Sequence, residues 1–504
     1  MSTTAELRTI SHWVAGKLVE GEGDRYGDVY DPARGQVAAR VAFATPRDVD
    51  RAVAAAKEAF PAWSRTSLAK RTEIMFAFRE LLKRHGDEVS NLIASEHGKP
   101  PSDAAGEIAR GLEVVELACS LSVMLKGEFS EQVSRNVDVY SVRQPLGVCA
   151  GITPFNFPAM VPLWMFPIAL ACGNTFVLKP SERDPSASLV LARLLKEAGL
   201  PDGVFNVVHG DKVAVDALLD HPDVAAISFV GSTPIAKYIY GRGASNGKRV
   251  QALGGAKNHL VAMPDADLGA VADALTSSAY GSTGQRCMAI SAAVVVGDIA
   301  DRLVPALKER MAKLRVGPAT DPKAELGPLV SKEAKARVES LIERGVQEGA
   351  TLVVDGRGIR IPGHEEGFFV GPTLFDRVTP DMEIYKQEIF GPVLVMLRVE
   401  TLDEALALIE RNPYGNGCSI FTNDGAAARH FERHASAGMV GINVPIPVPV
   451  GSYSFGGWKS SLFGDQHIYG PEGFRFYTRA KVVTTRWHEV ETVGVNLRFP
   501  GGHT

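Results

Sequence analysis

From Gly147 onward the chain alternates short apolar runs with helical segments. Four apolar runs share this pattern: Val148–Ile152, Thr175–Leu178, Val204–Val208 and Ala225–Val230. This alternation is typical of βαβ units, whose parallel strands form one sheet with helices on both faces. A second unit of the same kind begins around residues 250–262 and continues to residue 440. The sequence therefore predicts an α/β fold with two doubly wound parallel sheets.

The region before this alternation is predicted to be largely helical. Thr45 and Pro46 form a helix start, with threonine as the N-cap and proline at the first helical position. We expect this helix to end at Phe60, because Pro61 cannot continue the backbone hydrogen bonding. Three further helices are expected: Leu68–His85, Asp87–Glu96 and Ser102–Leu125.

The later part of the chain contains one predicted loop and one predicted strand. Residues Gly441–Phe463 carry three prolines and several glycines, and Lys481–Arg486 has a strand pattern. The longest apolar run, Phe157–Cys172, is interrupted by prolines and is too short to span a bilayer. We interpret it as a buried helix and expect no membrane association.

Charge and cysteine content exclude several classes of protein. The 504 residues carry a net charge of -4 without a basic block, so nucleic acid is not an expected partner. Met1–His12 has no apolar core, so no secretory signal is expected. Five cysteines without paired spacing indicate reduced thiols in a cytoplasmic protein, with no disulfide framework and no metal site.

One of these cysteines, Cys287, lies in a segment of small residues from Gly281 to Ala289. A catalytic thiol needs access and a thiolate, and two glycines and Arg286 could supply these. The alternative for an isolated cysteine is a small buried side chain in a glycine-rich turn.

Two strand ends have side chains suited to a dinucleotide. Lys179 and Glu182 follow one strand and could contact ribose hydroxyls, and Glu182 would repel a 2′-phosphate, which favours NAD over NADP. Gly231 and Ser232 follow another strand and open a helix whose N–H groups could hold a pyrophosphate. The segment is not G-x-G-x-x-G, so an ordinary turn with an N-cap serine and a surface ion pair remain alternatives.

Five motifs occur in order: Thr153-Pro-Phe-Asn-Phe-Pro158, Lys179-Pro-Ser-Glu182, Phe229-Val-Gly-Ser-Thr233, Gly284-Gln-Arg-Cys287 and Glu388-Ile-Phe-Gly-Pro392. Together they resemble the aldehyde dehydrogenase superfamily over nearly the whole chain. The resemblance implies four parts: an NAD-binding domain (1–126 and 147–253), a catalytic domain (254–441), a β-arm (127–146 and 477–490) and a loop segment at the substrate entrance (442–476). The arm implies a homo-oligomer, either a dimer or a tetramer.

The resemblance also implies roles for individual residues. Cys287 would attack the aldehyde, and Asn156 with the Cys287 backbone N–H would stabilise the oxyanion. Without the family, Asn156 is better explained as a turn residue between two prolines. The cofactor-binding residues expected on this basis are Phe155, Lys179, Glu182, Arg183, Gly231, Ser232, Glu388 and Phe390.

A departure from the usual family pattern points to a particular branch. Ala252 stands where ordinary members have the glutamate that activates the hydrolytic water, and alanine cannot be a general base. Thioester exchange with coenzyme A is therefore expected. The stretches Gly255–His259, Gly441–Pro449 and Phe455–Gly464 look like the acylating members that oxidise methylmalonate or malonate semialdehyde with loss of carbon dioxide.

The substrate carboxylate of such a semialdehyde needs a cation. Arg110 and Arg286 are the predicted clamps, because a guanidinium binds a carboxylate in bidentate fashion. The alternative is that both form structural ion pairs. Two rival functions also remain open: hydrolytic oxidation to a free acid, and a non-catalytic NAD-binding protein that kept the fold.

Overall fold

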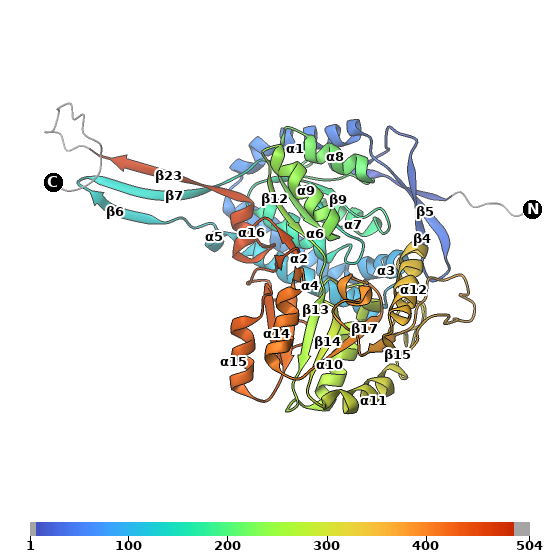
Figure 1. Ribbon diagram of the computed structural model, residues 1–504. Helices are drawn as coiled ribbons and strands as arrows, with labels where there is room; N and C mark the ends of the chain where they lie inside the picture. Colours follow the sequence, from blue (N-terminus) through green and yellow to red (C-terminus); the bar gives the residue numbers. More distant parts are fainter. Residues whose placement is uncertain (1–6, 488–504) are drawn as a thin grey trace, which may run out of the picture.

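The computed structural model describes residues 7–487 (Figure 1). Residues 1–6 of the predicted NAD-binding domain and residues 488–490 of the predicted arm lie outside the described residues, as does the first half of the Met1–His12 segment. Two large sheets lie one above the other in Figure 1, and a long ribbon of strands leaves the body on one side.

The first sheet has eight strands in the order β22-β12-β11-β8-β9-β10-β2-β3. Its central strands are parallel: β8 (Val148–Ile152), β9 (Thr175–Lys179), β10 (Phe205–Val207), β11 (Val224–Val230) and β12 (Arg249–Leu253). Its edges are antiparallel: β2 (His12–Val14), β3 (Lys17–Val19) and β22 (Leu462–Phe463). The central strands are buried on both faces, as a sheet covered by helices on both sides requires.

Nine helices among the described residues accompany this sheet: α1 (Pro46–Arg65), α2 (Leu68–Arg84), α3 (Gly86–His97), α4 (Pro101–Cys119), α5 (Leu121–Met124), α6 (Met160–Ala171), α7 (Ser186–Glu197), α8 (Lys212–Asp220) and α9 (Thr233–Ser245). The start of α1 has a capping box, because Thr45 and Asp48 each accept the other's backbone N–H. Helix α6 is buried along its whole length, and α4 packs against it. Its apolar character on all sides reflects this central position.

The second sheet has seven strands in the order β15-β16-β17-β14-β13-β19-β20. The strands are β13 (Asn258–Ala262), β14 (Ile290–Val296), β15 (Thr351–Val354), β16 (Thr373–Asp376), β17 (Val393–Val399), β19 (Gly417–Phe421) and β20 (Met439–Ile442). All neighbours are parallel except β15 and β16. The accompanying helices are α10 (Leu268–Tyr280), α11 (Ile299–Met311), α12 (Lys332–Gln347), α13 (Glu383–Lys386), α14 (Leu402–Arg411) and α15 (Gly425–His434).

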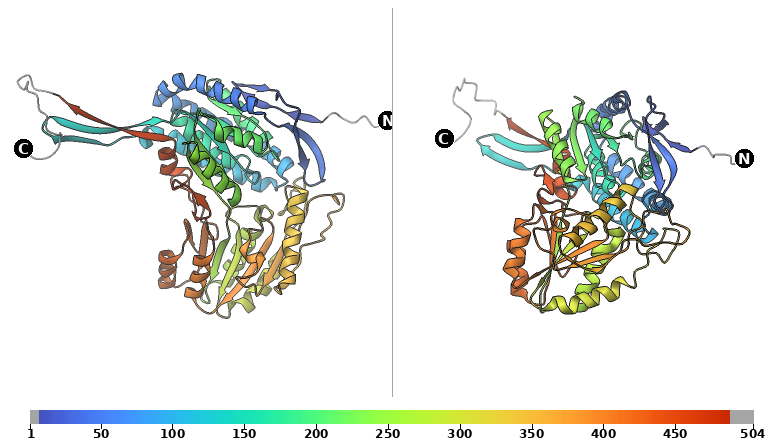
Figure 2. Two further views of the ribbon diagram at one scale, coloured as in Figure 1. Left: turned by 45° about the horizontal axis from the view of Figure 1, so that its top comes forward. Right: turned by 45° about the vertical axis from the view of Figure 1, so that its right-hand side comes forward.

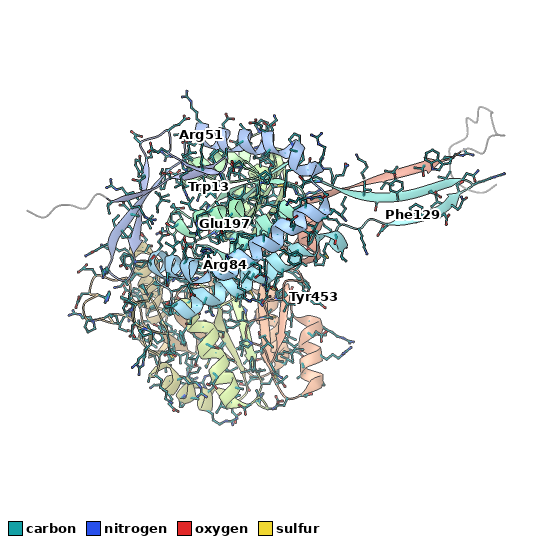
Figure 3. The ribbon with its side chains drawn as sticks, turned by 180° about the vertical axis from the view of Figure 1, so that it is seen from behind. Trp13, Arg51, Arg84, Phe129, Glu197 and Tyr453 are labelled. Carbon is teal, nitrogen blue, oxygen red and sulfur yellow. The ribbon has the colours of Figure 1, made fainter. Side chains whose placement is uncertain are left out.

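A three-stranded antiparallel sheet forms the projecting ribbon, which is seen from three directions in Figures 1 and 2. It consists of β6 (Phe129–Ser134), β7 (Val137–Pro145) and β23 (Thr478–Arg486), and α16 (Gly470–Phe476) leads into it. Figure 3 shows Phe129 on this ribbon, away from the main body, and its side chain is 64% exposed.

Three short strands form a separate sheet near the N-terminus: β1 (Arg8–Ile10), β4 (Tyr26–Asp31) and β5 (Gln36–Ala42). Two further strands pair near the second sheet: β18 (Tyr414–Gly415) and β21 (Trp458–Lys459). The two doubly wound sheets and the β-arm confirm the predicted fold class. Among residues 7–487, no helix is both long and apolar enough to cross a membrane.

Three sequence-based boundaries were wrong. Helix α1 does not end before Pro61 but continues to Arg65, because Trp63 beyond it is buried and its Nε1 donates to the Leu170 carbonyl at 3.2 Å. The predicted helix 102–125 is two helices, since the Ser120 N–H and hydroxyl both turn back to the Leu117 carbonyl. The predicted loop 441–463 contains β21 and β22, and β22 extends the first sheet by pairing with β12.

The buried indole of Trp63 generates a stability prediction. Trp63→Ala should lower the free energy of unfolding by about 3–5 kcal/mol, because it opens a cavity between α1 and α6. Urea unfolding monitored by circular dichroism measures the change. Glu58→Ala, a change at an exposed position of the same helix, is the control and should shift the midpoint little. Equal midpoints for the two variants would contradict the role assigned to Trp63.

Candidate active site

The loop before Cys287 has an unusual backbone. A short 3-10 segment (η1, Gly281–Gly284) contains Ser282, Thr283 and Gly284 at φ values of 50°, 53° and 71°. A side chain at Gly284 would meet the Gly391 carbonyl oxygen at 2.0 Å, so only glycine fits there. The Thr283 hydroxyl donates to the Gly327 carbonyl at 2.8 Å. Surrounding contacts thus hold a left-handed run that residues with side chains rarely adopt.

Cys287 lies where two cavities meet. One is a cleft of about 770 Å³ lined by the ends of the first sheet and by Glu388 and Phe390. The other is a pocket of about 240 Å³ lined mainly by α4, α6 and the 446–455 segment. Among the described residues, Cys287 is the one that both linings share. A reagent in either cavity can therefore reach the same thiol.

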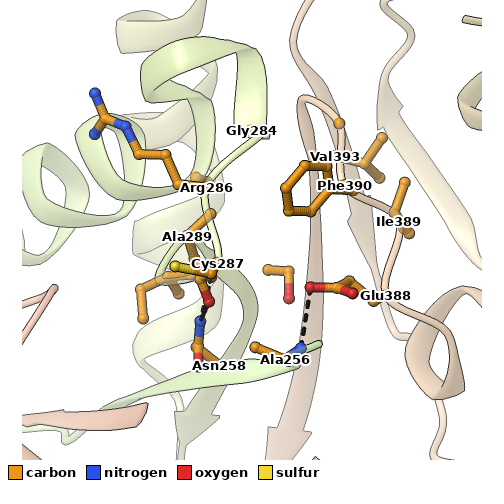
Figure 4. Close-up of a pocket in the computed structure, with 14 residues that line it drawn as sticks. Ala256, Asn258, Gly284, Arg286, Cys287, Ala289, Glu388, Ile389, Phe390 and Val393 are labelled. Carbon is orange, nitrogen blue, oxygen red and sulfur yellow. Dashed lines mark hydrogen bonds between the residues drawn. The ribbon is translucent and has the colours of Figure 1, made fainter. Parts of the chain in front are cut away.

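Two asparagines hold the backbone of Cys287. The Nδ2 atoms of Asn258 and Asn416 donate to the Cys287 carbonyl at 2.9 and 3.1 Å, and Asn258 also bonds the Ala289 carbonyl (Figure 4). Neither was singled out from the sequence. Asn258 belongs to the recognised stretch Gly255–His259, so its motif carried a signal, whereas Asn416 had none.

The Cys287 thiol is disfavoured as a thiolate in this arrangement. Burial and the Glu388 carboxylate raise its pKa to about 12, against opposing effects of backbone N–H groups and Arg286. The other four cysteines are buried, and burial also raises the pKa of each: Cys119, Cys149, Cys172 and Cys418. Cys287 is distinguished from them by its access to two cavities.

Asn156 lies beside the loop that precedes Cys287 (residues 281–286). Its Nδ2 donates to the Gln285 carbonyl at 3.0 Å, and it lines the same cleft as Cys287. An amide nitrogen carries two hydrogens, so the bond to Gln285 leaves a second donor. This geometry fits a group that stabilises negative oxygen next to the thiol.

A buried ion pair supports the Asn156 loop and was missed from the sequence. The Lys99 ammonium donates to Glu107 Oε2 and to the Asn156 carbonyl, each at 2.7 Å. Glu107 Oε1 accepts the N–H groups of Ala159 and Met160 at the start of α6. Both charged side chains are 1% exposed or less. The pair therefore ties α4 to the strand-to-helix turn that carries Asn156.

The predicted nucleotide-binding residues come together in the larger cleft. Its lining includes Phe155, Glu182, Arg183, Gly231, Ser232, Glu388 and Phe390. Lys179 is buried at the end of β9 and bonds Glu182 at 3.2 Å. Burial opposes ionisation of Glu182, but Lys179 and neighbouring donors lower its pKa below the usual value. Glu182 is therefore a charged acceptor at the cleft wall.

The start of α9 fits an anionic group. Ser232 is its N-cap, and its side chain makes no capping hydrogen bond, while Ser232, Thr233 and Gly231 all line the cleft. The first N–H groups of a helix and its dipole favour a phosphate. The cleft size, these donors and Glu182 together suit a dinucleotide.

Glu388 and Phe390 lie opposite Cys287 (Figure 4). Glu388 Oε1 accepts the Ala256 N–H at 3.0 Å, and a side chain at Gly255 would meet Oε2 at 2.3 Å. Burial raises the Glu388 pKa to about 7, although Ala256, Arg337 and Lys257 oppose this effect. The Phe390 ring meets the Phe155 ring edge to face at 5.8 Å.

Arg110 and Arg286 both line the smaller pocket, and both already have carboxylate partners. Arg110 bonds Glu113 at 2.8 Å and the Pro449 carbonyl at 3.0 Å. Arg286 bonds Asp103 at 2.6 Å, and its side chain extends away from the thiol in Figure 4. Both arginines thus form the ion pairs of the structural alternative, and the carboxylate-clamp role stays a prediction.

Residue 252 contributes no acid–base group. Ala252 is buried in β12 opposite Phe229. Lys257 and His259 are buried. Lys257 donates to the Ile384 and Gln387 carbonyls, and His259 contacts the Tyr385 hydroxyl.

The fold and these sites match a known family. The sequence profile of the Aldehyde dehydrogenase family matches residues 18–483. The chain belongs to the aldehyde dehydrogenase family, a family of oxidoreductases, and the resemblance inferred from its motifs is confirmed.

Individual relatives are similar over nearly the whole chain. Malonate-semialdehyde dehydrogenase of Pseudomonas aeruginosa is 58% identical, covering 95% of this chain and 97% of the relative. The mitochondrial acylating methylmalonate-semialdehyde/malonate-semialdehyde dehydrogenase of Rattus norvegicus is 50% identical, and the match covers 97% of this chain and 91% of the relative. The solved structure of methylmalonate-semialdehyde dehydrogenase from Oceanimonas doudoroffii has a TM-score of 0.95 and a sequence 55% identical to this chain. The match covers 96% of this chain and 99% of the solved chain.

A solved protein of Sinorhizobium meliloti, provisionally named as a methylmalonate-semialdehyde dehydrogenase and complexed with NAD, is 52% identical. The two structures superpose with a TM-score of 0.96, and the match covers 97% of this chain and 100% of the solved chain.

The environment of Cys287 predicts its reactivity. Below a thiol pKa of about 12, alkylation by iodoacetamide should rise about tenfold per pH unit without a plateau near neutrality. Glu388→Gln should accelerate alkylation at about pH 8 by roughly two- to tenfold, because it removes a negative charge that disfavours the thiolate.

The measurement is the pH dependence of iodoacetamide labelling at Cys287, read by mass spectrometry. Glu182→Gln removes the same charge from the same cleft and is the matched control. A plateau near pH 7, or equal acceleration by both variants, would refute this account of the thiol.

Proposed function

We propose that this protein catalyses the NAD-dependent, coenzyme A-acylating oxidation of methylmalonate or malonate semialdehyde. The observation that carries the proposal is the position of Cys287 between a dinucleotide-sized cleft and a small pocket lined by two arginines. The names of the relatives described above support the substrate class. The products would be propanoyl- or acetyl-coenzyme A and carbon dioxide.

Cys287 would attack the aldehyde carbon from the shared wall of the two cavities. The carbonyl oxygen then becomes negative, and the second N–H of Asn156 with the Cys287 backbone N–H would stabilise it. The Lys99–Glu107 pair contributes by fixing the Asn156 backbone, so that little reorganisation accompanies the reaction.

The larger cleft would hold the cofactor. Lys179 and Glu182 would contact one ribose, Ser232 and the first N–H groups of α9 the pyrophosphate, and Glu388 the ribose nearer Cys287. Phe155, Phe390, Gly231 and Arg183 would complete the wall. NAD would supply a hydride acceptor beside the reacting carbon, and Cys287 would keep the oxidised acyl group as a thioester.

The fate of that thioester depends on the absence of a base at Ala252. The substrate carboxylate lies β to the thioester carbonyl, so loss of carbon dioxide gives an enolate that the same oxyanion donors can stabilise. A proton from solvent would convert the enolate to the propanoyl or acetyl thioester, and the thiol of coenzyme A would then displace the Cys287 sulfur. We infer that decarboxylation precedes attack by coenzyme A. Release of methylmalonyl-coenzyme A as a product would contradict this order.

One observation favours the hydrolytic alternative. Glu388 lines the cavities beside Cys287 and has a pKa raised to about 7 by burial, a value suited to a general base. Against it, Oε1 is engaged by the Ala256 N–H. Free-acid formation that is lost in Glu388→Gln, while the burst of NADH persists, would identify such a base.

The arm supports the predicted assembly into a dimer or tetramer. Its strands expose large apolar side chains, among them Phe129, Val133 and Val482. Exposed apolar surface of this kind is typical of contacts between subunits. The cytoplasmic location stays a prediction.

Product analysis tests the proposed reaction. With methylmalonate semialdehyde and NAD, purified protein should form propanoyl-coenzyme A at least about tenfold faster with coenzyme A present than it releases acid without it. Mass spectrometry of the products gives both rates. Cys287→Ala is the control and should form neither product. Equal rates of acid release with and without coenzyme A would favour hydrolysis.

Arg110 has a separate kinetic prediction. Arg110→Ala should raise the KM for malonate semialdehyde by about tenfold or more, because a charge-assisted bond to the substrate carboxylate is lost. Steady-state NADH formation measures it, and propanal, which has no carboxylate, is the control substrate. A similar rise in KM for propanal would remove Arg110 from carboxylate binding.

A further inference from the structure

Asp103 occupies a position that the site described so far does not use. It lies in the first turn of α4 and lines both the substrate pocket and a neighbouring groove of about 400 Å³. Its side chain is 24% exposed. A half-buried carboxylate between two cavities needs partners for both oxygens.

Both partners of Asp103 belong to the loop that leads to Cys287, residues 281–287, which is the nucleophile loop of the proposed reaction. Oδ2 accepts the backbone N–H of Ser282 at 2.9 Å, and Oδ1 accepts from Arg286 Nη2 at 2.6 Å. Both residues lie within five positions of Cys287 in the chain. The Asp103 carboxylate on α4 thus contacts the loop at two points. One is Ser282, near the start of the loop, and the other is Arg286, which precedes Cys287 in the chain.

The hydrogen bond between Asp103 and Ser282 lies where the loop begins its run of positive φ values. Ser282 is the first of the three consecutive residues at positive φ. Such a conformation persists where surrounding contacts over-determine it. The charge-assisted bond from Asp103 is one of these contacts, and the Thr283 bond to Gly327 is another.

The bond to Arg286 orients a long, flexible side chain. A guanidinium has five N–H donors, and the bond to Asp103 uses one of them. The pairing holds Arg286 at the wall of the pocket that also contains Arg110 and Cys287. The remaining donors can then meet a substrate carboxylate without first ordering the side chain.

We propose that Asp103 is a positioning residue that holds both the nucleophile loop and the guanidinium of Arg286. The first role concerns any aldehyde that reacts at Cys287. The second rests on the proposed function, because it requires a substrate with a carboxylate.

The two roles are separated by two variants. Asp103→Asn keeps an oxygen for the Ser282 N–H but loses the charge that holds Arg286, whereas Asp103→Ala loses both. Arg286→Met removes only the guanidinium. Asp273→Asn is the matched control, because Asp273 lines the same groove and pairs with Arg310 instead.

The measurements are the NADH burst rate and the KM with malonate semialdehyde and with propanal. Asp103→Asn should raise the KM for the semialdehyde about tenfold and leave propanal unchanged. Asp103→Ala should in addition slow the burst with propanal about fivefold or more. The double variant Asp103→Asn/Arg286→Met should match Arg286→Met alone, because the two act through one contact.

Each half of the proposal has an outcome that overturns it. Additive increases in KM in the double variant would show that Asp103 does not act through Arg286. An unchanged propanal burst in Asp103→Ala would show that it does not hold the nucleophile loop. If the wild type does not favour the semialdehyde over propanal, the proposed function fails, while the propanal burst still tests the loop.

Discussion

The reacting centre depends on one buried ion pair, Lys99–Glu107. Two charges removed from water must satisfy each other and the surrounding polar groups, or the fold is strongly destabilised. Here the remaining oxygen of Glu107 caps the start of α6, and Lys99 also holds the Asn156 carbonyl. Helix α4 carries Glu107, Asp103 and Arg110, and Lys99 lies just before its first turn. This helix and the residues at its start therefore support Asn156, the loop before Cys287 and one wall of the smaller pocket.

The sequence was informative where local chemistry determines the structure. The alternation of apolar runs and helices predicted both sheets, and the Thr45-Pro46 helix start is present as a capping box. Ordered motifs led to Cys287, Asn156 and Glu388, which lie around one site. Their roles in the reaction stay predictions.

Predictions from the sequence were wrong or incomplete where contacts between residues far apart in the chain determine the structure. Helix α1 continues past Pro61 because the Trp63 indole bonds Leu170, a residue more than 100 positions away in the chain. Lys99, Asp103 and Asn416 were overlooked, since each acts on a residue far along the chain and none lies in a motif quoted for the family. Asp103, the partner of Arg286, and the Pro449 carbonyl, which accepts from Arg110, were hidden for the same reason, whereas Glu113 lies only three residues from Arg110.

The raised pKa of Cys287 has a consequence for the resting enzyme. Oxidation by peroxide proceeds through the thiolate, which then passes to sulfenic acid and to irreversible products. A thiol held protonated by burial and by Glu388 offers little of that species. The environment that keeps the Cys287 sulfur protonated should therefore also slow its oxidation by peroxide.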